Sequence, residues 1–251
     1  MTTTQLRLRS LAAVTVTALA VGALGACDTL NDTLNDKVFK DDSTVSQKIT
    51  SVRIDTESGG VRLRGKKRLA KVSLHREVSY RGTKPEGSTY RVENGVLVLG
   101  DCGSQCSVDY TVDVPAGIPV TGSAHSGAMK LSAVGEVKVS SSNGEIIVDG
   151  ASGPVDVHTT NGAIKAGGLK GAGITAQTSN GSISITPAVA QDVRAKTSNG
   201  SISVTAPAGP YRVSAQTSKG NKNIGIADSP SAAHHLDLTT SNGAITLKST
   251  K

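Results

Sequence analysis

The chain has 251 residues, of which only 2% are aromatic, none is Trp and 28 are Gly. Its formal net charge is +7, but so few aromatic side chains are available to stack on bases that we exclude nucleic acid as a partner. The charge fits a mild preference for anionic envelope polymers. The apolar residues are mainly Val, Ile, Leu and Ala, which favours a thin β core over a bulky globular one.

Residues 1–26 have the pattern of a lipoprotein signal peptide. Two arginines and no acid occur in residues 1–10, and an apolar stretch over 11–24 is too short for a comfortable membrane span. The stretch ends in Leu-Gly-Ala-Cys, which resembles a bacterial lipobox. The resemblance implies cleavage before Cys27 and acylation of its thiol, for example with palmitate.

Residues 27–48 are polar and rich in Asp, Asn and Thr, which predicts a tether behind the lipidated Cys27. Residues 49–251 then form the β-strand-repeat domain. We expect a protein attached to the cell membrane by its lipid anchor and facing outside the cytoplasm.

Two further cysteines, Cys102 and Cys106, are separated by three residues. An even pair in an exported protein favours a disulfide that fixes a local loop. A metal site would need two more ligands, and no other His or Cys lies near them in the sequence. We therefore predict a disulfide, no metal and no cofactor.

An Asn-Gly pair recurs through the second half of the chain. From Gly127 onward the glycines of successive units are 17, 18, 19, 19, 20 and 23 residues apart, with Lys219-Gly220 filling one place. A sustained period of this length indicates a solenoid. The predicted corners are Asn143-Gly144, Asn161-Gly162, Asn180-Gly181, Asn199-Gly200 and Asn242-Gly243.

Apolar residues alternate with polar ones on both sides of each corner. Such alternation predicts two short strands per unit, each with one buried face. The predicted core positions are Val137, Val139, Ile146, Val155, Val157, Ile164, Ile174, Ile183, Val193, Ile202, Leu236, Leu238 and Ile245.

The same pattern extends toward the N-terminus around Gly59 and Gly95, which predicts similar units there. One later unit departs from the rule, because Lys222 falls where an Ile is expected. We expect the last unit of the chain to form the exposed sheet edge, with Lys248 and Lys251 opposing strand addition.

Two all-β architectures fit these units. Asn-Gly is a strong hairpin signal, so an antiparallel meander or sandwich is one of them. The favoured prediction is a parallel two-sheet β-solenoid with coils of about 17–23 residues, because equivalent residues then stack coil on coil and the Asn side chains can hydrogen-bond along their column. Asn and Gly also tolerate the left-handed backbone expected at a tight corner.

The lipobox, the segment Asp-Tyr-Thr-Val-Asp-Val-Pro-Ala-Gly at 109–117 and the repeated Thr-Ser-Asn-Gly-Ser-Ile-Ser-Val carry a family resemblance. Over residues 48–248 the chain resembles an adhesin-like family of bacterial β-strand-repeat lipoproteins, whose domain has no assigned function. The resemblance implies a β-solenoid and a surface location.

Sequence motifs for catalysis are missing: the chain has no G-x-S-x-G elbow, no phosphate-binding loop and no calcium nonapeptide. We therefore expect a non-catalytic envelope protein whose solenoid head binds or organises surface material. The expected partners are the membrane, through the lipid, and an envelope polymer or a surface protein. A structural or assembly module is the alternative, and a polysaccharide-active enzyme is less favoured.

Overall fold

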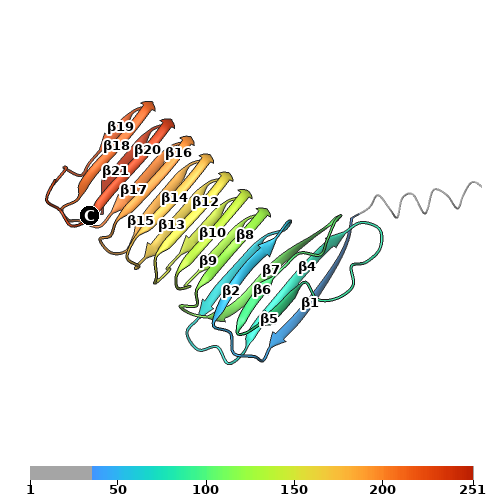
Figure 1. Ribbon diagram of the computed structural model, residues 1–251. Coiled ribbons are helices and arrows are strands. Elements are labelled where there is room, and N and C mark those ends of the chain that lie inside the picture. Colours follow the sequence, from blue (N-terminus) through green and yellow to red (C-terminus); the bar gives the residue numbers. More distant parts are fainter. Residues whose placement is uncertain (1–35, 251) are drawn as a thin grey trace, which may run out of the picture. The chain divides into compact units, whose positions relative to one another are not determined.

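A computed structural model describes residues 36–250, which fall in one compact unit beginning at Asp36. The predicted signal peptide and Cys27 lie outside the described residues. Every regular element from 36 to 250 is a β-strand, and the strands form one sheet of 11 and one of 10 (Figure 1).

The regular part of the molecule is a stack of two-strand coils, each giving one strand to each sheet. In this regular part, five strands belong to the 10-stranded sheet: β8 (Val120–Ser126), β10 (Val137–Asn143), β12 (Val155–Asn161), β14 (Ile174–Asn180) and β16 (Val193–Asn199). Their companions in the 11-stranded sheet are β9 (Met129–Ser132), β11 (Ile146–Asp149), β13 (Ile164–Leu169), β15 (Ile183–Pro187) and β17 (Ile202–Ala206).

Pairing between coils is parallel, and equivalent residues are in register. Val137 pairs with Val155, which pairs with Ile174, which in turn pairs with Val193. The predicted parallel two-sheet solenoid is therefore confirmed. The physical reason is that this register keeps every apolar column between the two sheets, whereas a slip of one residue would turn each column to solvent.

The C-terminal end departs from the order of the chain. It contains β18 (Arg212–Lys219), β19 (Lys222–Ile224), β20 (His235–Asn242) and β21 (Ile245–Ser249). The coil of β20 and β21 lies between the coil of β16 and β17 and that of β18 and β19, so the later segment is internal and the earlier one is outermost (Figure 1).

The expectation that the last coil forms the edge is therefore wrong. Lys248 pairs with Thr205 inside the sheet, and Lys251 lies outside the described residues. Lys222 occupies the core column beside Ile245 and is exposed, because its coil is the outermost one. This position explains why Lys222 replaces the usual Ile.

Two side chains cover backbone groups of the outermost strand, β18. The Asp228 carboxylate accepts a hydrogen bond from the backbone N–H of Val213 at 2.8 Å, and the Lys222 ammonium donates to the carbonyl oxygen of Ala215 at 3.4 Å. These contacts occupy groups that would otherwise pair with an added strand.

The N-terminal region mixes parallel and antiparallel pairing. Its strands are β1 (Lys37–Val45), β2 (Ser51–Thr56), β3 (Val61–Lys66), β4 (Val72–Tyr80), β5 (Tyr90–Glu93), β6 (Val96–Leu99) and β7 (Cys106–Pro115). The coil of β2 and β3 is inserted in space between β6 and β7 on one side and β8 and β9 on the other. Strands β1, β4 and β7 pair antiparallel.

The unit around Gly95 is not a coil. Strands β5 and β6 form an antiparallel hairpin, and Asn94 and Gly95 between them have φ of 51° and 82°. Two successive residues with positive φ make the turn that two-residue hairpins favour. The meander alternative is thus correct for this short segment.

The predicted tether of 27–48 is wrong for its second half, because residues 37–45 form β1 and pair with β4. The inward-facing residues of β1 are Lys37, Phe39, Asp41, Ser43 and Val45. Only two of these are apolar, so the strand lacks the alternation that identifies strands in a sequence.

Candidate binding surface

The predicted core residues all lie between the two sheets of the solenoid. Each of the 13 positions is at most 3% exposed, and together with the other buried aliphatic side chains they form one continuous cluster. Burying one such side chain contributes about 1.5–3 kcal/mol. The stack therefore gives its outer faces a fixed geometry.

The predicted corner asparagines form a side-chain ladder. Each Asn ends a strand of the 10-stranded sheet, and four of them donate from Nδ2 to Oδ1 of the Asn in the adjacent coil at 2.9 Å: Asn242 to Asn199, Asn199 to Asn180, Asn180 to Asn161, and Asn161 to Asn143. None of the five has a positive φ. The expected left-handed backbone is therefore wrong for these residues, and the position requires Asn for its side chain.

The corner glycines are required by a close approach between coils. A Cβ on Gly162 would lie 2.0 Å from the carbonyl oxygen of Gly144, and a Cβ on Gly181 would lie 1.9 Å from that of Gly162. Any side chain there would push two coils apart. The same clash would arise at Gly144, Gly200, Gly220 and Gly243.

A column of threonines, buried except in the outermost coil, completes the corner, a role that sequence reasoning missed. Thr178 Oγ1 donates to the Gly162 carbonyl at 3.1 Å, and Thr197 Oγ1 donates to that of Gly181 at 3.0 Å. Thr159, Thr217 and Thr240 make the equivalent contact. The constant place of Thr three residues before Gly was the signal that could have identified it.

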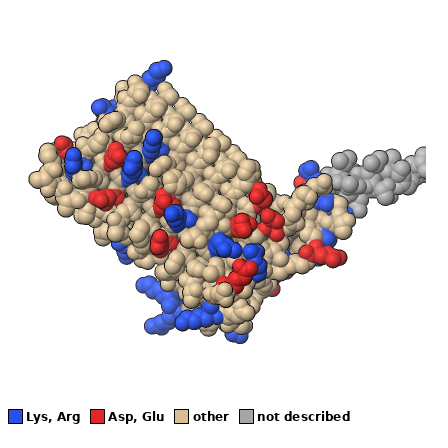
Figure 2. Space-filling model, in the orientation of Figure 1, with Lys and Arg blue, Asp and Glu red and all other residues tan. Residues whose placement is uncertain are grey.

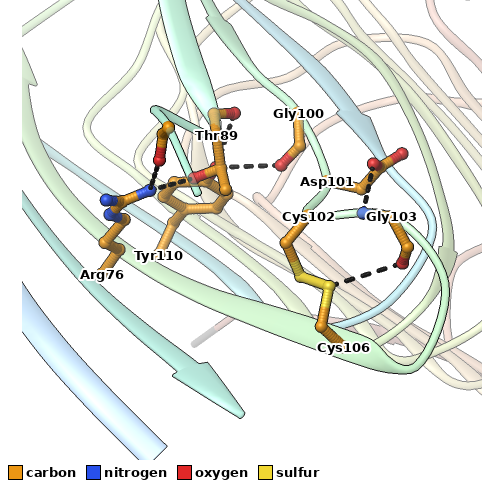
Figure 3. Close-up of a disulfide and its surroundings, with 9 residues drawn as sticks. Arg76, Thr89, Gly100, Asp101, Cys102, Gly103, Cys106 and Tyr110 are labelled. Atoms are coloured by element: carbon orange, nitrogen blue, oxygen red, sulfur yellow. Dashed lines mark hydrogen bonds between the residues drawn. A yellow bond between two sulfur atoms is a disulfide. The ribbon is translucent and has the colours of Figure 1, made fainter. Parts of the chain in front are cut away.

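The two predicted disulfide cysteines are joined in the connection between β6 and β7 (Figure 3). The Cα atoms of Cys102 and Cys106 are 5.9 Å apart. Asp101 lies beside the bridge and accepts a hydrogen bond from the backbone N–H of Gly103 at 3.0 Å. The bridge lies in a hydrogen-bonded loop.

Beside this loop is a buried polar network that no sequence spacing indicates. Arg76 is 8% exposed and donates to both carboxylate oxygens of Asp41, at 2.7–2.9 Å, and to Thr89 Oγ1 at 3.1 Å. The Tyr110 hydroxyl lies 2.8 Å from the Thr89 carbonyl and 2.9 Å from that of Gly100. Burial raises the pKa of Tyr110 to about 12. The network joins β1, β4 and β7 and serves their packing. Figure 3 shows Arg76 and Tyr110 beside Thr89 and Gly100.

The outer face of the 10-stranded sheet carries rows of polar side chains. One row runs through Asp55, Ser123, Ser140 and His158, and these residues line an open hollow of about 430 Å³. His158 Nε2 lies 2.7 Å from Asp156 Oδ1 on the same strand. The side chains stand in rows on an open face, so they offer contacts to an extended ligand.

The histidines are dispersed over the molecule. His75 contacts Asp42 at 2.8 Å, His158 contacts Asp156, and His234 contacts Asp192 at 3.6 Å. Among residues 36–250 no group of three or more His, Cys, Asp or Glu side chains could hold a metal ion.

The outer face of the 11-stranded sheet carries the densest positive charge. Arg62, Arg64 and Lys66 alternate along β3, and the turn after β3 adds three more bases. Lys130 on β9 is the register partner of Arg62. We name these seven residues the β3 basic patch: Arg62, Arg64, Lys66, Lys67, Arg68, Lys71 and Lys130. Figure 2 shows Lys and Arg side chains gathered at the lower edge of the described part.

Most of the β3 basic patch is unpaired. Arg64 Nε binds Asp113 Oδ1 at 2.6 Å, whereas within the described range no carboxylate lies within ion-pair distance of the other six. Arg62 and Lys130 flank an open hollow of about 390 Å³ whose floor is formed by small residues, including Gly60 and Ala128.

No helix in the described part of the chain is long and apolar enough to cross a membrane. The fold and its surfaces define a class: an all-β, parallel-sheet solenoid with open polar faces. Residues 89–249 match the Toastrack DUF4097 family, and the chain belongs to that family. No curated protein matches the chain.

Solved structures of similar extent match at low identity. A provisionally named cell adhesion protein from Clostridium sporogenes shares 12% identity with a TM-score of 0.39, and 85% of this chain matches 100% of that one. A provisionally named adhesin from Bacteroides fragilis shares 15% identity with a TM-score of 0.44, over 85% of this chain and 97% of that one. A third, from Parabacteroides distasonis, shares 12% identity with a TM-score of 0.37, over 84% and 97%.

Proposed function

We propose that this protein is a non-catalytic lipoprotein of the cell envelope, anchored through lipid on Cys27, whose solenoid head binds or organises surface material. The observation that carries the proposal is the arrangement of polar and charged side chains in straight rows on open sheet faces. Rows at the spacing of β-strands, about 4.8 Å, can contact an extended polymer at many points.

The test of binding uses residues 28–251, which include the whole compact unit from Asp36 onward. The oxidised protein is mixed with cell-wall sacculi, purified envelope polysaccharide and membrane vesicles, and the bound fraction is measured over a range of protein and salt concentrations. Saturable retention supports the proposal. A well-folded protein that none of these materials retains contradicts it.

The test of anchoring uses the full chain expressed in a lipoprotein-processing bacterium. Mass spectrometry of the N-terminal peptide is expected to find Cys27 as the first residue with acyl chains attached. Cys27→Ala is expected to release the protein from the membrane fraction, and an unlipidated native protein would contradict the anchoring.

Assembly by end-to-end strand addition is the alternative role, and two contacts oppose it. Asp228 and Lys222 occupy backbone groups of the outermost strand. A lysine at a sheet end also repels a second copy of the same end. Binding through the sheet faces is thus better supported than assembly through the end.

A further inference from the structure

The β3 basic patch differs from the rest of the surface in having many cations and few partners. Of its seven side chains only Arg64 forms an ion pair. Several exposed bases elsewhere are paired with a nearby carboxylate: Lys40 binds Glu77 at 2.9 Å and Lys165 binds Glu145 at 2.8 Å. Unpaired cations close together raise the local positive potential and attract anions.

The basic side chains of the patch are arranged in a row along β3. Arg62, Arg64 and Lys66 point outward from one strand, so neighbouring side chains start about 6.7 Å apart. Lys130 lies on the adjacent strand, about 4.8 Å from Arg62. The turn that follows β3 continues the positive row past the end of the strand. Such an array can bind several anionic groups of one chain at once.

The hollow beside Arg62 and Lys130 is a position in the basic row where an anionic group can bind. Gly60 and Ala128 leave room between the two bases, and Thr111 adds a hydroxyl at the rim. Asp109 is the one carboxylate there, and its Oδ1 accepts a hydrogen bond from the backbone N–H of Gly60 at 2.8 Å. With two bases, Arg62 and Lys130, against this one carboxylate, the hollow keeps a net positive charge.

The position of the patch favours a polymer over the membrane surface. Lys37, from which the chain leads back to Cys27, pairs with Tyr80 at one end of β4, whereas the basic turn precedes Val72 at the other end. Eight residues of strand separate these ends by about 27 Å. The anchored end of the domain and the patch are therefore apart.

We propose that the β3 basic patch is a binding site for a linear polyanion of the envelope, one that carries phosphate or carboxylate groups along its chain. This inference rests on the proposed function and assigns it a ligand class and a place. Binding of the polyanion releases counterions, so the affinity falls steeply as the salt concentration rises. Because the patch is a defined set of seven side chains, the binding is saturable.

The experiment compares charge-removing variants of the oxidised 28–251 protein. Arg62→Ser with Lys130→Ser tests the hollow, and Lys138→Ser with Lys196→Ser is the matched control. The control pair removes the same charge from exposed, unpaired lysines on the other sheet. Because all four side chains project outward, an unchanged melting temperature is expected for both variants.

Dissociation constants are measured for linear inorganic polyphosphate and for polygalacturonate at several salt concentrations. We expect the Arg62/Lys130 variant to bind at least tenfold more weakly than the wild type and the control to stay within twofold. Loss of two phosphate contacts should also reduce the slope of log K against log salt by about 1.4.

Parallel samples contain neutral dextran, phosphatidylcholine vesicles with and without anionic phosphatidylglycerol, and duplex DNA. Equal weakening by the control pair, no binding to either polyanion, or tighter binding to vesicles or DNA than to the polymers would overturn the assignment.

Binding of the same variants to sacculi and envelope polysaccharide tests the proposed function independently of the patch assignment. If they retain the Arg62/Lys130 variant as well as the wild type, the function stands and the patch assignment fails. If they retain neither protein while polyphosphate binds through the patch, the site is supported and the envelope function fails.

Discussion

The coils of the array and the strands near the N-terminus keep their positions by different means. From β12 to β17 every coil repeats the contacts of its neighbour: an apolar column, a Thr column, an Asn ladder and a Gly column. Strands β1, β4 and β7 have no such repeat; in addition to their backbone pairing and buried aliphatic side chains, they are joined by individual contacts, the ion pair of Arg76 with Asp41 and the hydroxyl of Tyr110. In the array, the position of a strand is determined by its register with the neighbouring coil. Near the N-terminus, specific side-chain partners contribute to it as well.

The two regions also use Asn-Gly for different purposes. Asn94 and Gly95 both have positive φ and reverse the chain in a hairpin. Asn180 has no positive φ and ends a strand whose chain continues into the other sheet. The same dipeptide is needed for its backbone freedom in one region, and for its amide side chain and lack of a Cβ in the other.

The largest loss of stability is expected where the backbones of neighbouring coils approach most closely. Gly181→Ala places a Cβ 1.9 Å from the carbonyl oxygen of Gly162 and should destabilise the protein by about 3–5 kcal/mol. Gly167→Ala is the control, because its Cβ would meet nothing closer than 3.7 Å. Denaturant unfolding measures both, and similar costs would show that coil spacing does not depend on the Gly column.

The equivalent change in the N-terminal region removes a charged partner. Arg76→Met leaves the partly exposed Asp41 carboxylate without its bidentate partner and should cost about 2 kcal/mol, less than for a fully buried pair because water reaches Asp41. Arg81→Met is the control, since the pair of Arg81 with Asp36 is exposed, and its midpoint in denaturant should not change. If both variants unfold at the wild-type midpoint, the partly buried pair of Arg76 with Asp41 does not hold β1 in place.

High pH should destabilise the N-terminal region through the buried hydroxyl of Tyr110. Its folded pKa, raised to about 12 by burial, exceeds the unfolded value near 10. The stabilisation is therefore complete below pH 10 and is lost as the pH rises toward 12, by about 2–3 kcal/mol. Unfolding free energies between pH 9 and 12 should fall more steeply in the wild type than in Tyr110→Phe, which keeps only Tyr211 as a tyrosine whose pKa burial raises. Parallel curves for the two proteins would refute the assignment.

A smaller effect is expected for one step of the ladder. Asn180→Ala removes hydrogen bonds to Asn161 and Asn199 and should cost about 1–2 kcal/mol. Ser179→Ala, next to it on the exposed face, should cost less than about 0.5 kcal/mol. Thermal unfolding provides the measurement, and equal midpoints for the two variants would mean that the ladder contributes nothing to stability.

The repeat made most of the array predictable. A period near 19 residues and the alternation around each Gly identify the coils, and the buried positions follow, as at Val157 and Ile183. The end of the array was harder to predict. The sequence shows Lys222 in a core column, and an exposed Lys there is compatible only with an outermost coil. Placing this coil at the end would have required knowing that the order of coils in space can differ from their order in the chain.

The sequence by itself determined the parallel two-sheet solenoid, its corners and its core, because each coil repeats a local pattern and like residues stack on like. Only the tertiary structure decided the exchange of coils at the two ends, the pairing of β1 with β4 and the gathering of Arg62 with Lys130. Strand β1 pairs with β4 across 27 to 43 positions of the chain, and Arg62 is 68 positions from Lys130, so these pairings follow no local period. They depend on which surfaces remain open after the array has formed, and that is a property of the folded chain.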